Sequence, residues 1–485
     1  MSQPGIFSPE HRRLTVGLLS LVLMIAFEAL AVATAMPAAA RDLRGFSLYT
    51  WGFTGFLTAS LFATATVGQI CDQLGPRLPL LVGGAVFAVG LVLAGSAPTM
   101  GMFVLGRVVQ GLGGGTAIVA LFVSVAAFPG YLRPKILAAL SACWVLPSVI
   151  GPPLAGLLTE TLSWRWVFWG LIPLVPIPLA MMMPGVSRMT GSKEAHRWSR
   201  TGLAFLLALG IATVQYAGQL VGVGAGAEGT GAGGGGSPPL GRWVAAGVLA
   251  AGGLLVAVTC LRRFLPAGTL RLRRGLPSVV AMRGFLAGAF FASEAFIPLM
   301  LVEHRGWSVT FAGMALTGAA LGWASGSWLQ GGRPQAMDAA GRQDRAGRFA
   351  VRGGAVVAAG IAVTGLGVIS TDQVTVPALV TPGGWLLAGL GMGMAMSSVS
   401  VLLFELSPVE QRGTNSAALQ ICDHLGSIMV LSVAGVIYAV GRASVSGSVL
   451  FGGVFAVTVL VGVGSVIVAT RVLPFGMSRP AGELG

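Results

Sequence analysis

The stretch Leu105–Gly114 reads LGRVVQGLGG, and it places one arginine and one glutamine inside an otherwise apolar segment. Moving a guanidinium to the middle of a membrane helix costs roughly 2.5 to 3.5 kcal/mol on insertion scales, so Arg107 needs an acidic partner or a water-filled cavity. The nearby glycines, among them Gly111 and Gly114, allow a neighbouring backbone to approach closely. We therefore expect a tightly packed membrane helix that carries a charge toward the interior of the protein.

The composition excludes a soluble globular protein. Of the 485 residues, 54% are hydrophobic and 9% are charged, whereas soluble domains carry about 25% charged residues. The net charge of +14 is explained by basic loops on one side of a membrane, so we expect no nucleic-acid partner. The sequence holds no GxxxxGK[ST] or HExxH motif and no Cys/His ligand set, and we therefore expect no enzyme, no cofactor and no metal site.

The hydrophobic pattern predicts an all-α integral membrane protein with fourteen transmembrane helices, because about 20 apolar residues span a bilayer. Lysine and arginine concentrate in alternate connecting segments, which predicts that both termini are cytoplasmic. The use of 28 arginines against 2 lysines is typical of a GC-rich bacterial genome, so we expect a multi-pass protein of the bacterial inner (plasma) membrane. The predicted spans are residues 14–37, 49–71, 78–97, 101–127, 134–158, 164–186, 201–221, 242–262, 280–303, 307–329, 349–370, 378–404, 414–440 and 446–471.

A short internal repeat predicts the domain organisation. Four identities follow Arg133 and recur after Arg412 with a constant shift of 279 residues: Ala138, Ala139, Leu140 and Cys143 against Ala417, Ala418, Leu419 and Cys422. Parallel repeats of this kind are typical of transporters that bind substrate where the repeats meet. We predict a six-helix bundle in residues 1–190, two inserted helices in 191–275 and a second six-helix bundle in 276–485.

Several stretches carry a resemblance to a known family. The loop GQICDQLGPRLPLL holds Gly68, Asp72, Gly75 and Arg77, the next motif holds Arg107, Gln110, Gly111 and Gly114, and PSVIGPPLAG holds Gly151, Pro152 and Gly156. The segments SWRWVFWGLIPL (163–174) and FEALAVATAMPAAARDL (27–43) complete the set. In this order they resemble the major facilitator superfamily, specifically its fourteen-helix drug:proton antiporter branch.

The resemblance implies export of small molecules in exchange for protons by alternating access. It also implies that Asp72 is part of a gating latch that forms when the cytoplasmic side closes, although positive-inside anchoring alone would account for Arg77. The sequence departs from the family's pattern at Pro147, where a glycine is usual, at Pro76 inside the loop motif, and at Glu28, where many relatives have aspartate.

Helix geometry predicts that Glu28 and Arg107 meet or share a hydrated pocket. At 1.5 Å per residue, Glu28 lies roughly 21 Å from the cytoplasmic entry of its span and Arg107 roughly 9 Å from the outer entry of its own. In a core of about 30 Å these depths are similar. We therefore predict that the two share a pocket in which Glu28 takes up and releases a proton.

Glu294 and Asp423 are two further carboxyl groups inside predicted spans, and intramembrane acids often belong to proton relays. A structural alternative remains for each acid, namely an interhelical hydrogen bond. Glu160 and Glu303 lie at outer helix ends, where we expect solvated side chains. Proline and glycine at Gly151–Pro152 predict a bend or a close contact with a neighbouring helix.

The sequence predicts a small lipophilic or amphiphilic substrate, protons and the lipid bilayer as partners, and a monomer. Aromatic side chains suit lipophilic cations but equally suit contact with lipid or core. Two other functions stay open: a dedicated exporter of a lipid or secondary metabolite, or an importer, and a membrane scaffold or receptor without coupling. The candidate aromatic lining comprises Trp51, Phe53, Phe56, Trp144, Phe290, Phe291 and Phe296.

Overall fold

The structure, a computed structural model, describes residues 5–187, 189, 191, 198–225, 240–331, 339–368, 370–371, 374–375, 379–442 and 444–472. Its first part contains α1 (Arg12–Asp42), η1 (Phe46–Leu48), α2 (Trp51–Leu74), α3 (Arg77–Gly95), α4 (Met100–Ser124), η2 (Val125–Ala127), α5 (Arg133–Ala142), α6 (Val145–Thr161), α7 (Trp166–Trp169), η3 (Ile172–Leu174) and α8 (Pro176–Val186). The inserted pair is α9 (Trp198–Ala225) and α10 (Leu240–Phe264).

The last part contains η4 (Thr269–Arg271), α11 (Leu276–Glu303), α12 (Val309–Gly331), α13 (Ala339–Leu366), α14 (Val380–Leu406), η5 (Val409–Gln411), α15 (Arg412–Gly441) and α16 (Gly447–Thr470). Between α13 and α14, β1 (Ser370–Thr371) and β2 (Val374–Thr375) pair antiparallel, with Ser370 opposite Thr375.

The fourteen-span prediction is confirmed within the described residues. Thirteen segments are long and apolar enough to cross a membrane. The fourteenth is α12, whose 23 residues are long enough for a core of about 30 Å at 1.5 Å per residue.

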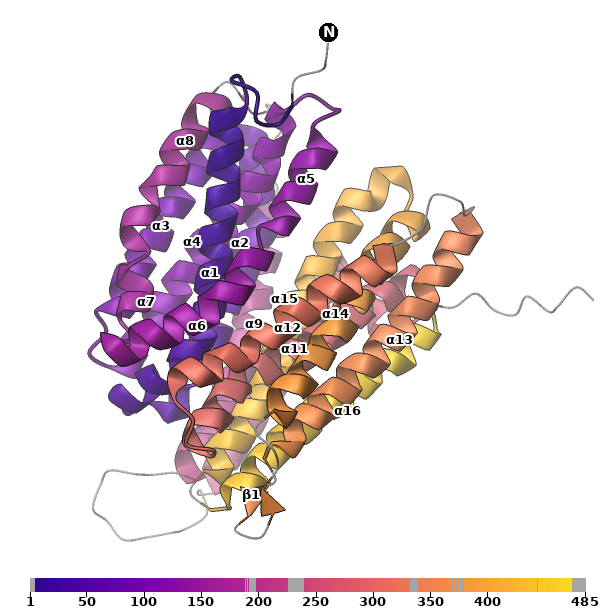
Figure 1. Cartoon of the computed structure of the whole chain (residues 1–485). Helices are drawn as coiled ribbons and strands as arrows, with labels where there is room; N and C mark the ends of the chain where they lie inside the picture. The colour runs from indigo at the N-terminus through magenta and orange to yellow at the C-terminus, as the bar shows by residue number, and fades with distance from the viewer. Residues whose placement is uncertain are drawn as a thin grey trace, which may run out of the picture.

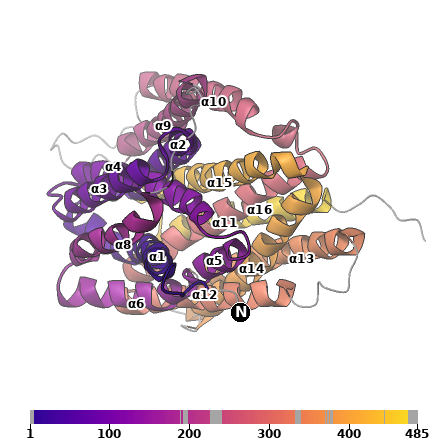
Figure 2. The same ribbon diagram turned by 90° about the horizontal axis from the view of Figure 1, so that it is seen from above.

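The helices form two groups, which we call the N-terminal bundle (α1–α8) and the C-terminal bundle (α11–α16) (Figure 1). Seen along the bundle axis, α9 and α10 lie at one edge, with α9 beside α2 and α15 (Figure 2). We call the end at which α1 begins the N-terminal side, and the end at which α1 finishes the far side. The two bundles converge at the far side and splay apart at the N-terminal side (Figure 1).

The fifth span is two helices rather than the single helix predicted for residues 134–158. α5 ends at Ala142 and α6 begins at Val145. Pro147 explains the break, because a proline lacks an amide hydrogen and its ring clashes with the carbonyl four residues earlier, here that of Cys143. At Gly151–Pro152 the sequence predicts a bend or a close contact with a neighbouring helix. α6 continues through both Pro152 and Pro153, and a Cβ on Gly313 of α12 would lie 2.4 Å from the Pro152 carbonyl oxygen.

The sixth span, predicted as residues 164–186, is likewise divided into α7, η3 and α8. Pro173 lies in η3 and Pro176 begins α8. Each proline is tolerated at the first positions of a helix but does not continue a preceding one. The span therefore crosses the bundle as short pieces joined at prolines.

The glycines of α4 bring its backbone against two neighbours. A Cβ atom built on Gly111 would lie 2.2 Å from the carbonyl oxygen of Phe56 in α2, and one on Gly113 would lie 2.2 Å from the amide nitrogen of Phe87 in α3. Real Cβ atoms do not approach a backbone this closely, so any larger residue would push the helices apart. This packing positions the Arg107 side chain of α4 in the interior, as the sequence predicts.

Candidate functional site

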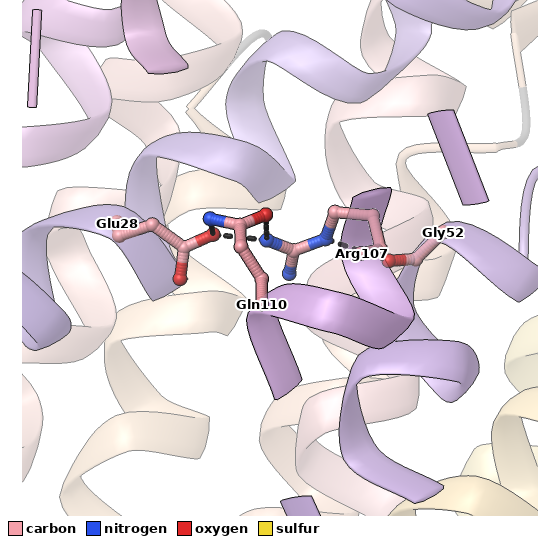
Figure 3. Close-up of polar contacts among 4 residues, drawn as sticks. All are labelled: Glu28, Gly52, Arg107 and Gln110. Atoms are coloured by element: carbon pink, nitrogen blue, oxygen red, sulfur yellow. Dashed lines mark hydrogen bonds and ion pairs between the residues drawn. The ribbon is translucent and has the colours of Figure 1, made fainter. Parts of the chain in front are cut away.

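Glu28, Arg107 and Gln110 form a buried polar cluster between α1, α2 and α4 (Figure 3). Arg107 forms an ion pair with Glu28 through Nη1 and Oε1, and the same Nη1 donates to Oε1 of Gln110 over 2.9 Å. Arg107 Nε donates to the carbonyl oxygen of Gly52 over 3.0 Å. The guanidinium carbon lies 4.6 Å from the centre of the Phe56 ring.

The cluster is closed to solvent. The exposed fraction is 0% for Glu28 and Gln110 and 3% for Arg107. Gln110 Nε2 donates to Glu28 Oε1 over 3.3 Å, so one carboxylate oxygen accepts from both partners. The other oxygen, Oε2, is buried and accepts no hydrogen bond from a described residue.

This arrangement leaves one carboxylate oxygen of Glu28, Oε2, available to a proton. A buried acceptor without a partner is unfavourable, and protonation at Glu28 Oε2 would leave the bonds at Oε1 in place. Protonation would also remove the negative charge that compensates Arg107. The structure thus brings together Glu28 and Arg107, and it adds Gln110 and the Gly52 carbonyl as groups that hold the arginine.

Glu294 and Asp423 belong to the C-terminal bundle, and neither joins this cluster. Asp423 in α15 forms an ion pair with Arg283 in α11, with 2.6 Å between Oδ1 and Nε. Glu294, in the interior of α11, is partly exposed, and the structure shows no hydrogen bond or ion pair from it to a described residue. The Asp423 pairing was not anticipated from the sequence, because the approach of α11 to α15 depends on the tertiary fold.

The loop motif lies between α2 and α3 on the N-terminal side. Gly75 has φ +74°, a left-handed conformation that favours glycine, and Gly68 has open space around it. The side chains of Asp72 and Arg77 are exposed, and no described residue forms an ion pair with either. Among the described residues, therefore, neither side chain takes part in the predicted latch, and the bundles splay apart on that side (Figure 1).

The proline motif of α6 packs across the two bundles against α12. A Cβ on Gly156 would lie 2.5 Å from Cα of Thr310, and one on Gly313 would lie 2.4 Å from the Pro152 carbonyl oxygen. Pro153 cannot donate to the carbonyl of Val149, and Thr317 of α12 donates to that carbonyl instead, over 3.2 Å.

Gly151 faces Phe27 of its own bundle, and Gly114 makes an ordinary contact with the Phe87 ring, 3.4 Å from its built Cβ.

Glu160 and Glu303 are exposed, as the sequence predicts, and both also join the two bundles at the far side. Glu303 pairs with Arg41 over 2.5 Å between Oε1 and Nη2. Glu160 accepts from the amide of Thr310 over 3.1 Å and from its hydroxyl over 2.5 Å. Sequence spacing alone carries no signal for these contacts, because each partner comes from the other bundle.

Tyr49 extends this far-side contact inward. Its hydroxyl donates to the carbonyl of Ala295 over 2.7 Å, and its ring lies 5.7 Å from that of Phe296 and 6.3 Å from that of Tyr438. The guanidinium of Arg442 lies 3.9 Å from the centre of the Phe46 ring. Aromatic contacts, one ion pair and hydrogen bonds together thus join the two bundles at the far side.

The predicted aromatic lining is divided among different environments. Phe290 stacks on Trp385 at 4.4 Å and Phe291 contacts Phe290 edge-on at 5.5 Å. Phe53 contacts Tyr49 at 5.6 Å, while Trp144 is 44% exposed. The seven aromatic residues therefore do not form one continuous surface.

The chain is similar in sequence to bacterial multidrug transporters. Multidrug resistance protein 3 of Bacillus subtilis (strain 168) is 27% identical over 320 residues, a match that covers 65% of this chain and 60% of that protein. Multidrug transporter protein MdtP of the same organism is 25% identical over 438 residues, covering 90% of this chain and 77% of the relative. The chain thus matches about three fifths of the length of the first relative.

Solved structures of transporters share the fold. An auto-inhibited POT family peptide transporter aligns with TM-score 0.64 and 14% identity, over 96% of this chain and 99% of that one. The inward open xylose transporter XylE from E. coli aligns with TM-score 0.60 and 13% identity, over 96% and 97%. The family model described as Major Facilitator Superfamily matches residues 16–431. The chain, a multi-pass membrane protein, therefore belongs to the major facilitator superfamily.

Proposed function

We propose that this protein is a proton-coupled antiporter that exports hydrophobic or amphiphilic small molecules by alternating access. The observation that carries the proposal is the Glu28–Arg107 pair, in which a carboxylate with one unpartnered oxygen lies beside a fixed cation. Ionisable groups are rare in membrane helices and mark ion or substrate pathways. The named multidrug relatives support the choice of substrate class.

Protonation of Glu28 is the step that changes the charge of the site. With Glu28 ionised, the pair is neutral as a whole and Gln110 bridges both partners. With Glu28 protonated, Arg107 keeps its charge without a counter-ion, which raises the free energy of the closed arrangement relative to one that admits water. A proton thus favours one of two conformations, which coupling requires.

Glu294 supplies a second carboxyl on the opposite bundle. Its carboxyl group is partly exposed and has no described partner, so it could bind a proton and a cationic amphiphile alternately. Phe290, one helical turn away, is already stacked on Trp385, which offers an apolar wall beside the acid. Asp423 is less suited to this role because Arg283 already compensates its charge.

The orientation follows from charge. If the N-terminal side is cytoplasmic, as the excess of arginine there predicts, the far side faces outward and this conformation is closed to the outside. A single chain contains the whole Glu28 cluster, so a monomer suffices for this mechanism.

The test is proton movement in proteoliposomes loaded with a pH dye, on addition of a panel of lipophilic cations and amphiphiles. We expect at least one compound to drive proton movement in the wild type and the Glu28→Gln variant to abolish it. The matched control is Glu10→Gln, which removes an exposed acid near the N-terminus and should behave as wild type.

Other outcomes would contradict the proposal. If compounds move and Glu28→Gln matches the wild type, coupling belongs to Glu294 or Asp423. If no compound in a broad panel moves protons while the purified protein binds one specific lipid or metabolite, a dedicated carrier is the better assignment. Binding without any movement would favour an uncoupled receptor.

A further inference from the structure

The inserted helix α9 occupies the seam between the two bundles. It packs against α2 of the N-terminal bundle and α15 of the C-terminal bundle (Figure 2). α10, in contrast, packs mainly on α9 at the edge of the molecule. Because α9 contacts both bundles, any movement of one bundle relative to the other must break or deform one of its two interfaces.

The interface of α9 with α2 contains a polar and an aromatic contact. Gln215 Nε2 donates to the Thr58 hydroxyl over 3.0 Å in a buried position. Ten residues earlier in α9, the ring of Phe205 meets that of Phe62 edge-on, with 6.1 Å between their centres. The two contacts lie at different heights along the helices, so they hold α9 against α2 at two separate points.

The interface of α9 with α15 depends on the absence of a side chain. A Cβ built on Gly218 would lie 2.7 Å from Cγ2 of Val436. Around Gly218 and Val436, no hydrogen bond or ion pair joins α9 to α15 among the described residues. This is a close apolar contact that can separate without leaving a buried polar group unpaired.

A small cavity of about 20 Å³, lined by both polar and apolar residues, lies where α2, α9 and α15 meet, and it is large enough for one water molecule. Gln215 lines it, is 5% exposed, and has a carbonyl oxygen that accepts no hydrogen bond from the described residues. The other lining side chains include several hydroxyls. The polar lining comprises Ser47, Thr50, Thr54, Gln215, Gln219 and Ser432.

Opening of the far side requires α2 to leave α15. The two helices touch beside the cavity, where a Cβ on Gly435 would lie 2.4 Å from the Thr50 hydroxyl oxygen. The cavity is therefore a point at which water can enter this seam and replace the contact. When α2 and α15 separate, α9 stays with one of them and releases the other.

We propose that α9 forms part of the barrier that closes the far side. When the far side opens, α9 moves together with α2, and its contact with α15 at Gly218–Val436 breaks. The inserted helices α9 and α10 then contribute to closing the far side and do not only connect the two bundles. This inference rests on the alternating access proposed above, but it does not depend on protons or on the nature of the substrate.

Two crosslinks test the direction of movement, each in full-length protein whose four native cysteines are replaced by alanine. One pair, Gly218→Cys with Val436→Cys, joins α9 to α15. The other, Phe205→Cys with Phe62→Cys, joins α9 to α2. Both are linked by the same short bis-methanethiosulfonate reagent, and each linked protein is compared with its own reduced form.

Hydrogen–deuterium exchange of peptides that cover residues 43–55 reports opening of the far side without any substrate. We expect the α9–α15 link to slow exchange there by at least tenfold and the α9–α2 link to leave it unchanged. Unchanged exchange with α9 linked to α15 would overturn the proposal, and so would suppressed exchange with α9 linked to α2. Failure to find a transported compound would weaken the proposed function but would leave this result decisive for α9.

Discussion

The Glu28–Arg107 pair is buried so completely that removing one partner costs far more than removing both. A buried charge that loses its counter-ion is destabilised by about 3 to 5 kcal/mol, whereas replacing both partners costs much less. We expect Glu28→Gln and Arg107→Gln each to lower the melting temperature in detergent, and the double variant to recover a large part of the loss. Strictly additive losses would show that the two side chains are not coupled in the folded protein.

Close backbone packing at Gly111 makes this residue intolerant of even one methyl group. The Cβ of alanine would lie 2.2 Å from the Phe56 carbonyl oxygen, so α2 and α4 must move apart, which costs about 1 to 3 kcal/mol. The control is Gly101→Ala at the start of the same helix, where no atom lies within 4 Å. Gly111→Ala should reduce the fraction of monodisperse protein and Gly101→Ala should not, and equal behaviour would contradict the packing argument.

Among individual side chains, the sequence predicted the contact of Glu28 with Arg107 but did not predict the far-side contacts of Glu303 and Glu160. Equal depths along two helices suffice to predict that Glu28 meets Arg107, because both residues belong to one bundle with known helix directions. The contacts of Glu303 with Arg41 and of Glu160 with Thr310 join different bundles. Their formation depends on which side of the molecule is closed, and a single sequence is compatible with both states.

Among the elements, α6 and α12 share a hydrogen bond that exists because Pro153 frees a carbonyl. Thr317→Val would leave the Val149 carbonyl unpaired at the contact, at a cost of about 1 to 3 kcal/mol. Pro153→Ala restores an amide hydrogen that can pair with that carbonyl inside α6. We therefore expect Thr317→Val to speed hydrogen exchange in α6, and Pro153→Ala combined with it to restore slow exchange. A double variant that exchanges as fast as Thr317→Val alone would rule out this account.

Helix bounds were predicted within a few residues for most spans, because hydrophobic length alone decides where a chain crosses the membrane. The fifth and sixth spans differ because prolines interrupt the backbone hydrogen bonds inside an apolar segment, which hydropathy does not register. α13 begins at Ala339, ten residues before the predicted span 349–370, because its first turns are polar. Pro147 was noted in the sequence as a departure from the family motif. Its effect on Cys143, four residues earlier, is what divides α5 from α6.

For the whole molecule, we expect the far-side contacts to influence the populations of the two access states proposed above. Arg41 is 61% exposed and Glu303 23% exposed, so their pair contributes about 1 kcal/mol or less. Arg41→Gln should therefore shift the population toward the open far side by no more than about fivefold. The measurement is labelling of a single cysteine introduced at the far side with a membrane-impermeant maleimide. The shift should vanish at high salt, where the pair is screened.

A matched variant makes this prediction specific. Arg44→Gln removes an exposed arginine two residues beyond α1 that forms no ion pair with a described residue. It changes the net charge of the far side by the same amount as Arg41→Gln. Equal shifts from both variants would assign the effect to general surface charge and not to the pair with Glu303.

The fifth span can bend most easily where it is divided, between the end of α5 and the start of α6. Between α5 and α6 the amide of Trp144 bonds to the carbonyl of Ser141, three residues back and not four, over 3.4 Å. α6 is fastened to α12 at the far side, whereas α5 extends to the splayed N-terminal side (Figure 1). We therefore expect this span to bend between α5 and α6, so that α5 can move on the N-terminal side while the contact of α6 with α12 stays in place.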